Sequence, residues 1–270
     1  MATFLARHQL APVAADLAPL SRQADDLAAR APALGLAQRL RHLRDLVPGR
    51  IVLTTGFGLE AQAITHTIFE NELPIDVVTL DTGRLFPETH AVWAATEARY
   101  GRRIRGVSPD HEQVEAFVER EGIDGIRNSV AARRTCCHIR KVEPLGRALA
   151  GAAAWITGVR GDQSRTRAEM PYATVDATRA LIKVNPLIDW SRDRVVDYVS
   201  AHRIPYNALH DRGFVSIGCA PCTRAVALGE PERAGRWWWE QETQKECGLH
   251  IAAANPTPQS PARELADVES

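Results

Sequence analysis

The chain has no excess of charge of either sign. Its 270 residues include 33 Lys and Arg against 33 Asp and Glu, so the formal net charge is +0. Proteins that bind nucleic acids or anionic membrane surfaces are usually basic. We therefore expect no nucleic acid and no membrane among its partners.

Long hydrophobic runs are also missing. The longest uncharged apolar run covers only residues 148–159, 12 positions, whereas a membrane-spanning helix needs about 20. Arg7 and His8 stand where a signal peptide would have its apolar segment. These absences predict a soluble, cytoplasmic protein.

Cysteines are few and unevenly placed. There are 5, namely Cys136, Cys137, Cys219, Cys222 and Cys247. An odd number in a chain of this length argues against a disulfide framework of the secreted type. In a reducing compartment, clustered cysteines more often bind metal or take part in chemistry.

Apolar β-branched runs alternate with amphipathic segments, which predicts an α/β protein with a mostly parallel sheet flanked by helices. Strands are expected at 51–55, 75–80, about 102–109, 152–159 and 178–184. Helices are expected as two short segments within 12–46, and at 61–72, 87–100, 110–122, 135–150, 191–202 and 231–244. We divide the chain into a helical segment 1–48, an α/β domain 49–245 and a flexible C-terminal tail 246–270, which is rich in Pro, Ala and polar residues.

A glycine-containing loop follows the first expected strand. Residues 56–61 read G-x-G-x-x-A, and Asp81 follows 20 positions later at the end of the second strand. The pattern is typical of a dinucleotide-binding fingerprint, but it also suits any tight strand-to-helix turn that needs glycine. A nicotinamide dehydrogenase would leave the cysteines without a role, which counts against the dinucleotide-binding interpretation. Both interpretations, a dinucleotide site and a tight turn that needs glycine, remain open at this point.

Four of the cysteines form two pairs. Cys219 and Cys222 form a C-x-x-C pair, and the adjacent Cys136 and Cys137 lie 82 positions upstream of it. Four thiolates can hold a zinc ion or an iron–sulfur cluster. Zinc pairs usually have two to four residues between them, so the adjacent pair favours a four-iron cluster, whose corners can take neighbouring thiolates. A zinc site and two unrelated reduced pairs remain the alternatives.

Positive charge is concentrated around these cysteines. It comes from Arg133, Arg134, Arg140, Lys141, Arg160, Arg165, Arg167, Arg233 and Arg236. Such segregated charge can stabilise thiolates and can hold an anionic substrate. About half of these arginines would be solvated surface residues in an ordinary protein.

The fifth cysteine stands apart, close to the tail. Cys247 is flanked by Lys245 and His250. A thiol near a flexible end and near cations suits a mobile nucleophile. An exposed thiol without a role is the alternative.

Taken together, these residues resemble the phosphoadenylyl-sulfate reductase family, and within it the bacterial assimilatory adenylyl-sulfate reductases, over about residues 50–250. The matching segments are Leu80-Asp81-Thr82-Gly83-Arg84-Leu85, Pro87-Glu88-Thr89, Cys136-Cys137 with Arg140-Lys141, Trp155-Ile156-Thr157-Gly158, Tyr206-Asn207, His210-Asp211-Arg212-Gly213, Ser216-Ile217-Gly218-Cys219, Cys222-Thr223-Arg224, Gly235-Arg236-Trp237 and Lys245-Glu246-Cys247-Gly248-Leu249-His250. No single segment is specific, but the set in this order is.

The resemblance implies the adenine-nucleotide hydrolase-like fold that is shared with ATP pyrophosphatases. It also implies that the loop after the first strand is a modified phosphate loop, made of Thr54, Thr55, Gly56, Phe57, Gly58, Leu59 and Glu60. Gly56 stands where the family pattern has a small hydroxyl residue, and Ala61 stands where an acidic residue is common. The further substrate-binding residues implied are Asp81, Thr82, Gly83, Arg84, Leu85, Lys141, Gly158, Arg167, Arg233, Arg236 and His250.

The implied reaction is the reduction of adenylyl sulfate to sulfite and AMP. Cys247 would be the nucleophile, an S-sulfocysteine the intermediate, and reduced thioredoxin or a glutaredoxin-like donor the reductant. One 4Fe-4S cluster per chain would be held by Cys136, Cys137, Cys219 and Cys222, and a homo-oligomer is expected. The alternatives are a preference for 3′-phosphoadenylyl sulfate or the use of both substrates, a zinc-bound nucleotide-binding module, and a nicotinamide dehydrogenase.

Overall fold

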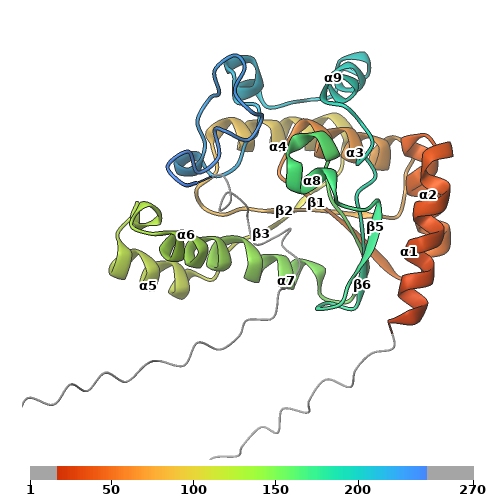
Figure 1. The fold of residues 1–270 in the computed structure, drawn as a ribbon, viewed down its shortest axis with the longest axis horizontal. Coiled ribbons are helices and arrows are strands. Elements are labelled where there is room, and N and C mark those ends of the chain that lie inside the picture. Colours follow the sequence, from red (N-terminus) through yellow and green to blue (C-terminus); the bar gives the residue numbers. More distant parts are fainter. Residues whose placement is uncertain (1–16, 242–270) are drawn as a thin grey trace, which may run out of the picture.

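The computed structural model describes residues 17–241, which are built around one six-stranded sheet (Figure 1). The strand order is β3-β2-β1-β4-β6-β5. The strands are β1 (Arg50–Thr55), β2 (Asp76–Leu80), β3 (Arg105–Val107), β4 (Ala152–Ile156), β5 (Ala173–Asp176) and β6 (Leu181–Val184). All neighbouring strands are parallel except β5 and β6. The mostly parallel α/β sheet predicted from the sequence is confirmed.

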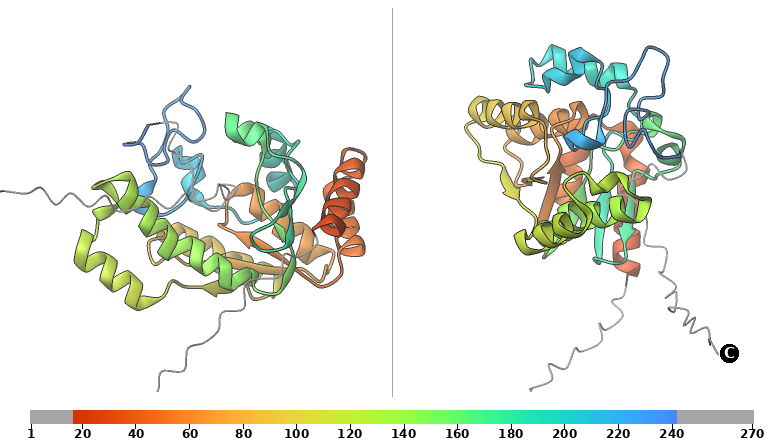
Figure 2. Two further views of the ribbon diagram at one scale, coloured as in Figure 1. Left: turned by 60° about the horizontal axis from the view of Figure 1, so that its bottom comes forward. Right: turned by 90° about the vertical axis from the view of Figure 1, so that its left-hand side faces the viewer.

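Helices cover both faces of this sheet (Figures 1 and 2). On one side lie α3 (Leu59–Glu70), α4 (Pro87–Tyr100) and α9 (Arg192–Ala201), and on the other lie α5 (His111–Glu121), α6 (Val130–Cys137) and α7 (Glu143–Leu149). The short α8 (Arg165–Ala168) follows the loop after β4. No helix in residues 17–241 is long and apolar enough to cross a membrane.

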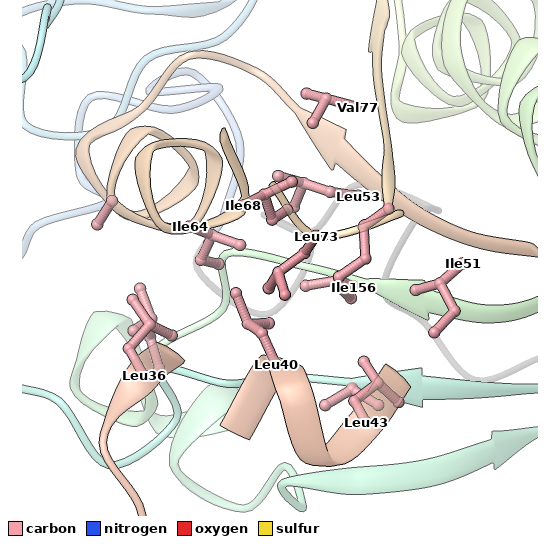
Figure 3. Close-up of a cluster of buried hydrophobic side chains, with 14 of the residues drawn as sticks. Leu36, Leu40, Leu43, Ile51, Leu53, Ile64, Ile68, Leu73, Val77 and Ile156 are labelled. Atoms are coloured by element: carbon pink, nitrogen blue, oxygen red, sulfur yellow. The ribbon is translucent and has the colours of Figure 1, made fainter. Parts of the chain in front are cut away.

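The two N-terminal helices share the core of the sheet. α1 (Ala18–Arg30) packs against β5 and β6, and α2 (Leu36–Leu46) packs against α3. Leu40 and Leu43 of α2 are fully buried and meet Leu53, Ile64 and Ile156 in one cluster (Figure 3). Burial of each such side chain contributes about 1.5–3 kcal/mol, so α2 and the sheet stabilise each other.

Local signals mark the ends of two predicted helices. The Asp110 side chain accepts a hydrogen bond from the Gln113 backbone N–H at 3.0 Å and caps α5, which ends at Gly122 with φ of 86°. Ser191 caps α9 in the same way through the Arg194 N–H at 3.2 Å. Such caps satisfy donors that have no partner inside the helix.

Three sequence-based expectations are corrected. The helix expected at 135–150 begins earlier, at Val130, where Ser129 caps it, and it passes through a π-helical turn, His138–Val142, before α7. The strand β5 was not predicted, and the strand expected at 178–184 begins only at Leu181.

The third correction concerns the C-terminal part. No α-helix forms over 231–241, the described part of the helix expected at 231–244. Arg236 instead pairs with Thr223 as an isolated antiparallel bridge, and Trp237 has φ of 42°. Backbone hydrogen bonds to the segment around Cys222 replace those of a helix, and apolar periodicity could not reveal this partner.

Candidate functional site

A cavity of about 250 Å³ lies at the carboxyl ends of the parallel strands. Open α/β sheets bind ligands at this edge, because the loops after several strands meet there. Its walls come from the loops after β1, β2 and β4, from the start of α7 and from the C-terminal part of the chain. Of the residues that sequence reasoning assigned to a substrate, it is lined by Thr54, Thr55, Gly56, Gly58, Glu60, Thr82, Leu85, Lys141, Gly158, Arg167, Arg233 and Arg236.

The loop after β1 turns its backbone toward the cavity and its large side chains away from it. Phe57 is fully buried, and its ring stacks on Trp93 with 5.7 Å between the ring centroids. Its φ is 58°, a left-handed conformation that costs a residue with a side chain about 1 kcal/mol or more. Phe57 and the buried Leu59 thus support the loop from behind and do not line the cavity, contrary to the prediction of direct contact.

Helix α3 begins at the far end of this loop, and its first turn faces the cavity. Gly58 is the N-cap residue, and Glu60 and Ala61 of the first turn line the cavity. The N-terminus of a helix presents unpaired N–H groups and partial positive charge, which favour anions. The loop can therefore hold a phosphate group without a charged side chain of its own.

Close packing requires glycine at one position of this wall but not at another. A Cβ atom on Gly158 would lie 3.2 Å from the Ala61 backbone nitrogen and 3.2 Å from the Glu60 Cβ, so glycine lets β4 and α3 approach closely. A Cβ atom on Gly56 would meet nothing within 4 Å. The family's hydroxyl residue would fit at Gly56, so packing does not explain its replacement.

The buried guanidinium of Arg160 ties this wall together. Its side chain is fully buried and pairs with Glu60 at 2.7 Å, with Glu232 at 2.9 Å and with Asp162. Burial, the largest single influence, lowers the pKa of Arg160, but Glu60 and Glu232 together raise it above its ordinary value. Burial raises the pKa of Glu232. Because carboxylates occupy its guanidinium, Arg160 organises the wall.

The loop after β2 only partly meets the expectation. Thr82 and Leu85 line the cavity, whereas Asp81, Gly83 and Arg84 do not. The Asp81 carboxylate accepts the Gly83 N–H at 3.1 Å and lies 3.5 Å from His90, while Arg84 pairs with Asp124 at 2.8 Å. These three residues shape the turn.

Arg236 is held flat against the backbone of the C-x-x-C segment. Its Nε donates to the Cys222 carbonyl at 3.3 Å, and its guanidinium lies 4.7 Å from the centre of the Trp237 ring. A Cβ atom on Gly218 would come within 2.3 Å of this guanidinium, so only glycine leaves room for it. Arg167, on α8, donates to the Gln163 side chain at 2.5 Å.

The four paired cysteines meet at a second, smaller cavity. Cys136, Cys137, Cys219 and Cys222 all line it, with Arg84, Arg133, Arg140, Lys141 and Trp237 among the surrounding residues. Two elements 82 positions apart in sequence thus bring their thiols to one place, and none of these four cysteines forms a disulfide. Among residues 17–241, no three cysteine, histidine or acidic side chains meet the geometry of a site for one metal ion.

The π-helical turn His138–Val142 carries cations between the two cavities. Arg140 is buried and donates to the Thr82 carbonyl at 2.6 Å. Lys141, the next residue, lines both cavities. Single π turns within helices are frequent at functional sites, and here the extra residue rotates the helix between the cysteine pair and α7.

The surroundings of the thiols suit a cluster of metal and sulfide. Burial opposes the thiolate form, because it raises the pKa of Cys136 and, followed by the neighbouring Cys219, raises the pKa of Cys222 to about 11, whereas the nearby Lys141 lowers both pKa values and so favours the thiolates. The Trp237 Nε1 is buried and has no hydrogen-bond partner within residues 17–241, and the Thr82 hydroxyl lies 3.2 Å from the Cys219 sulfur. Cations and N–H or O–H donors around cysteine thiolates stabilise iron–sulfur clusters, so this donor set fits one.

The two cavities share a wall. Lys141, Cys219 and Trp237 line both. A ligand in the larger cavity would therefore lie close to any group held by the cysteines. This adjacency is the central geometric fact of the site.

Several residues of the larger cavity were not assigned to it from the sequence. They include Trp155, Gln163, His210, Ser216 and Glu232. Burial, followed by Arg192, lowers the pKa of His210, and neither of its ring nitrogens has a hydrogen-bond partner among the described residues. Trp155, His210 and Ser216 belong to segments that carried the family resemblance, whereas nothing in the sequence marked Gln163 or Glu232. Cys247 and His250 lie outside the described residues.

Comparison with known proteins gives a consistent result. A sequence profile described as "Phosphoadenosine phosphosulfate reductase domain" matches residues 50–225. The chain is 53% identical over 225 residues to a protein of Agrobacterium fabrum named adenosine 5′-phosphosulfate reductase, covering 83% of this chain and 86% of that protein. It is 52% identical over 200 residues to a protein of the same name from Allochromatium vinosum, covering 74% and 78%.

Among solved structures, the chain is similar to the phosphoadenylyl-sulfate reductase of Candida auris, crystallised as a phosphate complex. The TM-score is 0.63 at 28% identity, and the match covers 73% of this chain and 94% of that one. The similarity therefore extends over most of the fold that carries the cavity.

Proposed function

Because the chain belongs to the phosphoadenosine phosphosulfate reductase family, we propose that it reduces adenylyl sulfate to sulfite and AMP through Cys247, with reduced thioredoxin as the electron donor. The observation that carries this proposal is the wall that the larger cavity shares with the cysteine cavity. It would bring the sulfate end of a nucleotide close to the cysteines.

The substrate would lie across the two walls of the larger cavity. The phosphate loop and the N-terminus of α3 suit the phosphate, and Lys141, Arg233 and Arg236 line the side that the cysteines share. Charge-assisted hydrogen bonds from such cations are the strong kind. They would hold the sulfate with its sulfur exposed to an incoming thiolate.

The proposed reaction proceeds in two displacements. The Cys247 thiolate attacks the sulfur, the bond from sulfur to the bridging oxygen breaks, and AMP leaves with the electron pair. A thioredoxin thiolate then attacks the Cys247 sulfur and releases sulfite. The second thioredoxin thiol resolves the mixed disulfide, so that thioredoxin supplies two electrons and Cys247 is restored.

The cysteine cavity would hold one 4Fe-4S cluster on Cys136, Cys137, Cys219 and Cys222. When bound, the cluster would supply a fixed charge distribution beside the sulfate and would not carry electrons to it. Lys141 lines both cavities, so its ammonium would stand between cluster and substrate. The chain's own contribution is to bind and orient the nucleotide and to keep its sulfur accessible.

Adenylyl sulfate is favoured over its 3′-phosphorylated form as the substrate. The relatives at about 50% identity bear the name adenosine 5′-phosphosulfate reductase, whereas the structure named for the 3′-phosphorylated substrate is only 28% identical. The phosphorylated nucleotide remains the second candidate within the same chemistry.

The decisive experiment is sulfite release by anaerobically purified protein with reduced thioredoxin, run side by side on the two nucleotides. We expect turnover of adenylyl sulfate and at least tenfold lower kcat/KM for the 3′-phosphorylated form. A reversed preference would overturn the choice of substrate, and no sulfite from either nucleotide would overturn the reaction.

A further inference from the structure

A buried ion pair fastens the end of the described chain to the helix that carries the cysteine pair. The Glu240 carboxylate accepts hydrogen bonds from Arg133 Nε at 2.9 Å and Nη2 at 2.7 Å. The two side chains are only 1% and 3% exposed. Arg133 lies on α6, and Glu240 lies next to the last described residue, so the contact joins segments 107 positions apart.

Arg133 belongs to the site as well as to this pair. It lines the cysteine cavity, and its guanidinium lies 4.8 Å from the centre of the Trp237 ring, which Arg236 also contacts. Burial, the largest influence, lowers the pKa of Arg133, but Glu240 and then Cys137 raise it above the ordinary value. The Arg133 guanidinium therefore keeps its positive charge beside Glu240.

Weaker contacts hold the same stretch of chain. The Trp237 N–H donates to the Cys222 carbonyl at 3.2 Å, and the Arg127 guanidinium lies 5.5 Å and 5.4 Å from the rings of Trp238 and Trp239. We call residues 237–240 the anchor. It begins at a residue that lines both cavities, so the end of the described chain lies beside the site.

Stability alone gives little reason for an ion pair in this position. Removing two charges from water costs about as much as their attraction returns, and hydrophobic replacements are often equally stable. What a bidentate pair adds is one defined geometry. Here that geometry fixes where the following chain starts.

The chain that starts there carries the proposed nucleophile. Cys247 follows Glu240 by seven positions, and seven residues can span at most about 25 Å when fully extended. A tethered group reacts at an effective concentration that is set by the length of its tether and by where the tether is attached. Moving the point of attachment would lower that concentration without touching the thiol.

We infer that Arg133 and Glu240 are positioning residues of the proposed reaction, which hold the anchor so that Cys247 meets the bound sulfate. This inference rests on the proposed function. It adds that an ion pair between the cysteine helix α6 and the end of the described chain sets the rate of the first displacement, although neither residue is expected to touch the substrate.

The test measures the first displacement by itself. Anaerobic protein is mixed with saturating adenylyl sulfate without thioredoxin, and mass spectrometry follows the addition of one SO3 group to Cys247. In Glu240→Gln we expect this rate to fall about fivefold or more, because the neutral amide binds Arg133 less firmly. The affinity for AMP and the alkylation rate of Cys247 without substrate should stay within twofold of wild type.

Two further variants and one control complete the design. Arg133→Lys keeps the charge but loses the two parallel N–H donors of the guanidinium, so it should slow adduct formation as much as Glu240→Gln does. Glu240→Asp keeps the carboxylate and should react faster than Glu240→Gln. Glu230→Gln is the matched control, because Glu230 pairs with Arg224 at 2.8 Å in the same segment but is 33% exposed. It should react at the wild-type rate.

The outcomes separate this inference from the proposed function. If the wild-type protein forms no SO3 adduct on Cys247, the proposed reaction fails and the inference with it. If wild type forms the adduct and Glu240→Gln forms it at the same rate, only the anchor is refuted. A parallel fall in Tm, AMP affinity and rate would reduce the pair to a structural role and would also refute it.

Discussion

The two walls of the large cavity are built in different ways. One wall consists of the loops after β1 and β4 and the start of α3, and we call it the phosphate-loop wall. It follows from regular structure, because parallel strands end at Thr55 and Ile156 and α3 starts a few residues after β1. The cysteine wall combines a π-helical turn, a short 3₁₀ turn at Ala220–Cys222 and the anchor. The first wall is fixed by backbone pairing in the sheet, and the second by side chains and single loop contacts.

The two walls also differ in the partners of their buried arginines. Arg160 of the phosphate-loop wall contacts three carboxylates, whereas Arg133 of the cysteine wall has Glu240 on one side and the Trp237 ring on another. Sequence inspection counted both among the positive charges that could serve an anion. In the structure both organise their walls.

Loss of the proposed nucleophile should have the largest effect and should spare both walls. We expect Cys247→Ser to abolish sulfite release, because a serine hydroxyl cannot replace a thiolate in attack on sulfur or in exchange with a thioredoxin thiol. Iron content and AMP binding should remain at wild-type levels. Sulfite production by this variant above the rate without enzyme would remove Cys247 from the reaction.

Breaking the cysteine wall should come next. Cys219→Ser removes a thiol that lines both cavities and lies 3.2 Å from the Thr82 hydroxyl. We expect loss of most of the bound iron, measured by chemical iron analysis and visible absorbance, and a fall in sulfite release of at least about a hundredfold. AMP affinity, which depends mainly on the other wall, should change less than fivefold. Full iron content would exclude Cys219 as a ligand.

Breaking the phosphate-loop wall should lower stability. Arg160→Leu removes the buried partner of Glu60 and Glu232, whose side chains are only 13% and 14% exposed, and charges left without a partner at buried sites typically cost about 3–5 kcal/mol. Urea unfolding should show this loss, with weakened AMP binding. In Arg120→Leu, which removes the exposed partner of Glu121, the urea midpoint should stay close to that of wild type, because exposed ion pairs contribute little to stability. An unchanged urea midpoint for Arg160→Leu would contradict the role of the buried network.

The smallest expected effect is a change in pH dependence at His210. Its folded-state pKa lies below the ordinary 6.5 because the side chain is buried. As pH falls below 6.5, the unfolded chain therefore binds a proton that the folded chain resists, and stability decreases. His210→Gln should show a smaller loss of Tm between pH 7 and pH 5.5 than wild type. The exposed His111 provides the control, and His111→Gln should match wild type.

Sequence periodicity was sufficient for the regular part of the molecule. The alternation of buried strands and capped helices predicted α3, α4, α5 and α9 close to their observed bounds, because each of these elements follows from its own residues. The sequence also predicted that the loop after β1 binds the substrate. The sequence could not tell that Phe57 and Leu59 turn into the core while Thr55, Gly56 and Gly58 face the cavity.

The irregular part shows where sequence reasoning stopped. The run Trp237-Trp238-Trp239 suited a helix by composition, yet its backbone pairs with the segment around Cys222, far from any helical partner. Glu232 lies in a polar, charged stretch of sequence of the kind found on protein surfaces, and only the fold brings it to Arg160. The contact of Glu232 joins residues 72 positions apart, and neither this contact nor the pairing of Trp237 with Cys222 leaves a periodic trace in the sequence.

By itself, the sequence determined the α/β architecture, the identity of the four paired cysteines and their separation from Cys247. Local propensity, capping and residue chemistry depend on neighbours along the chain, so they can be read without a structure. Only the tertiary structure decided that Lys141, Cys219 and Trp237 form one wall between two cavities, and that Arg133 and Arg160 are occupied by carboxylates. Those contacts depend on packing between segments that are distant in sequence. Because this packing buries the guanidinium groups of Arg133 and Arg160, their positions in the site are fixed.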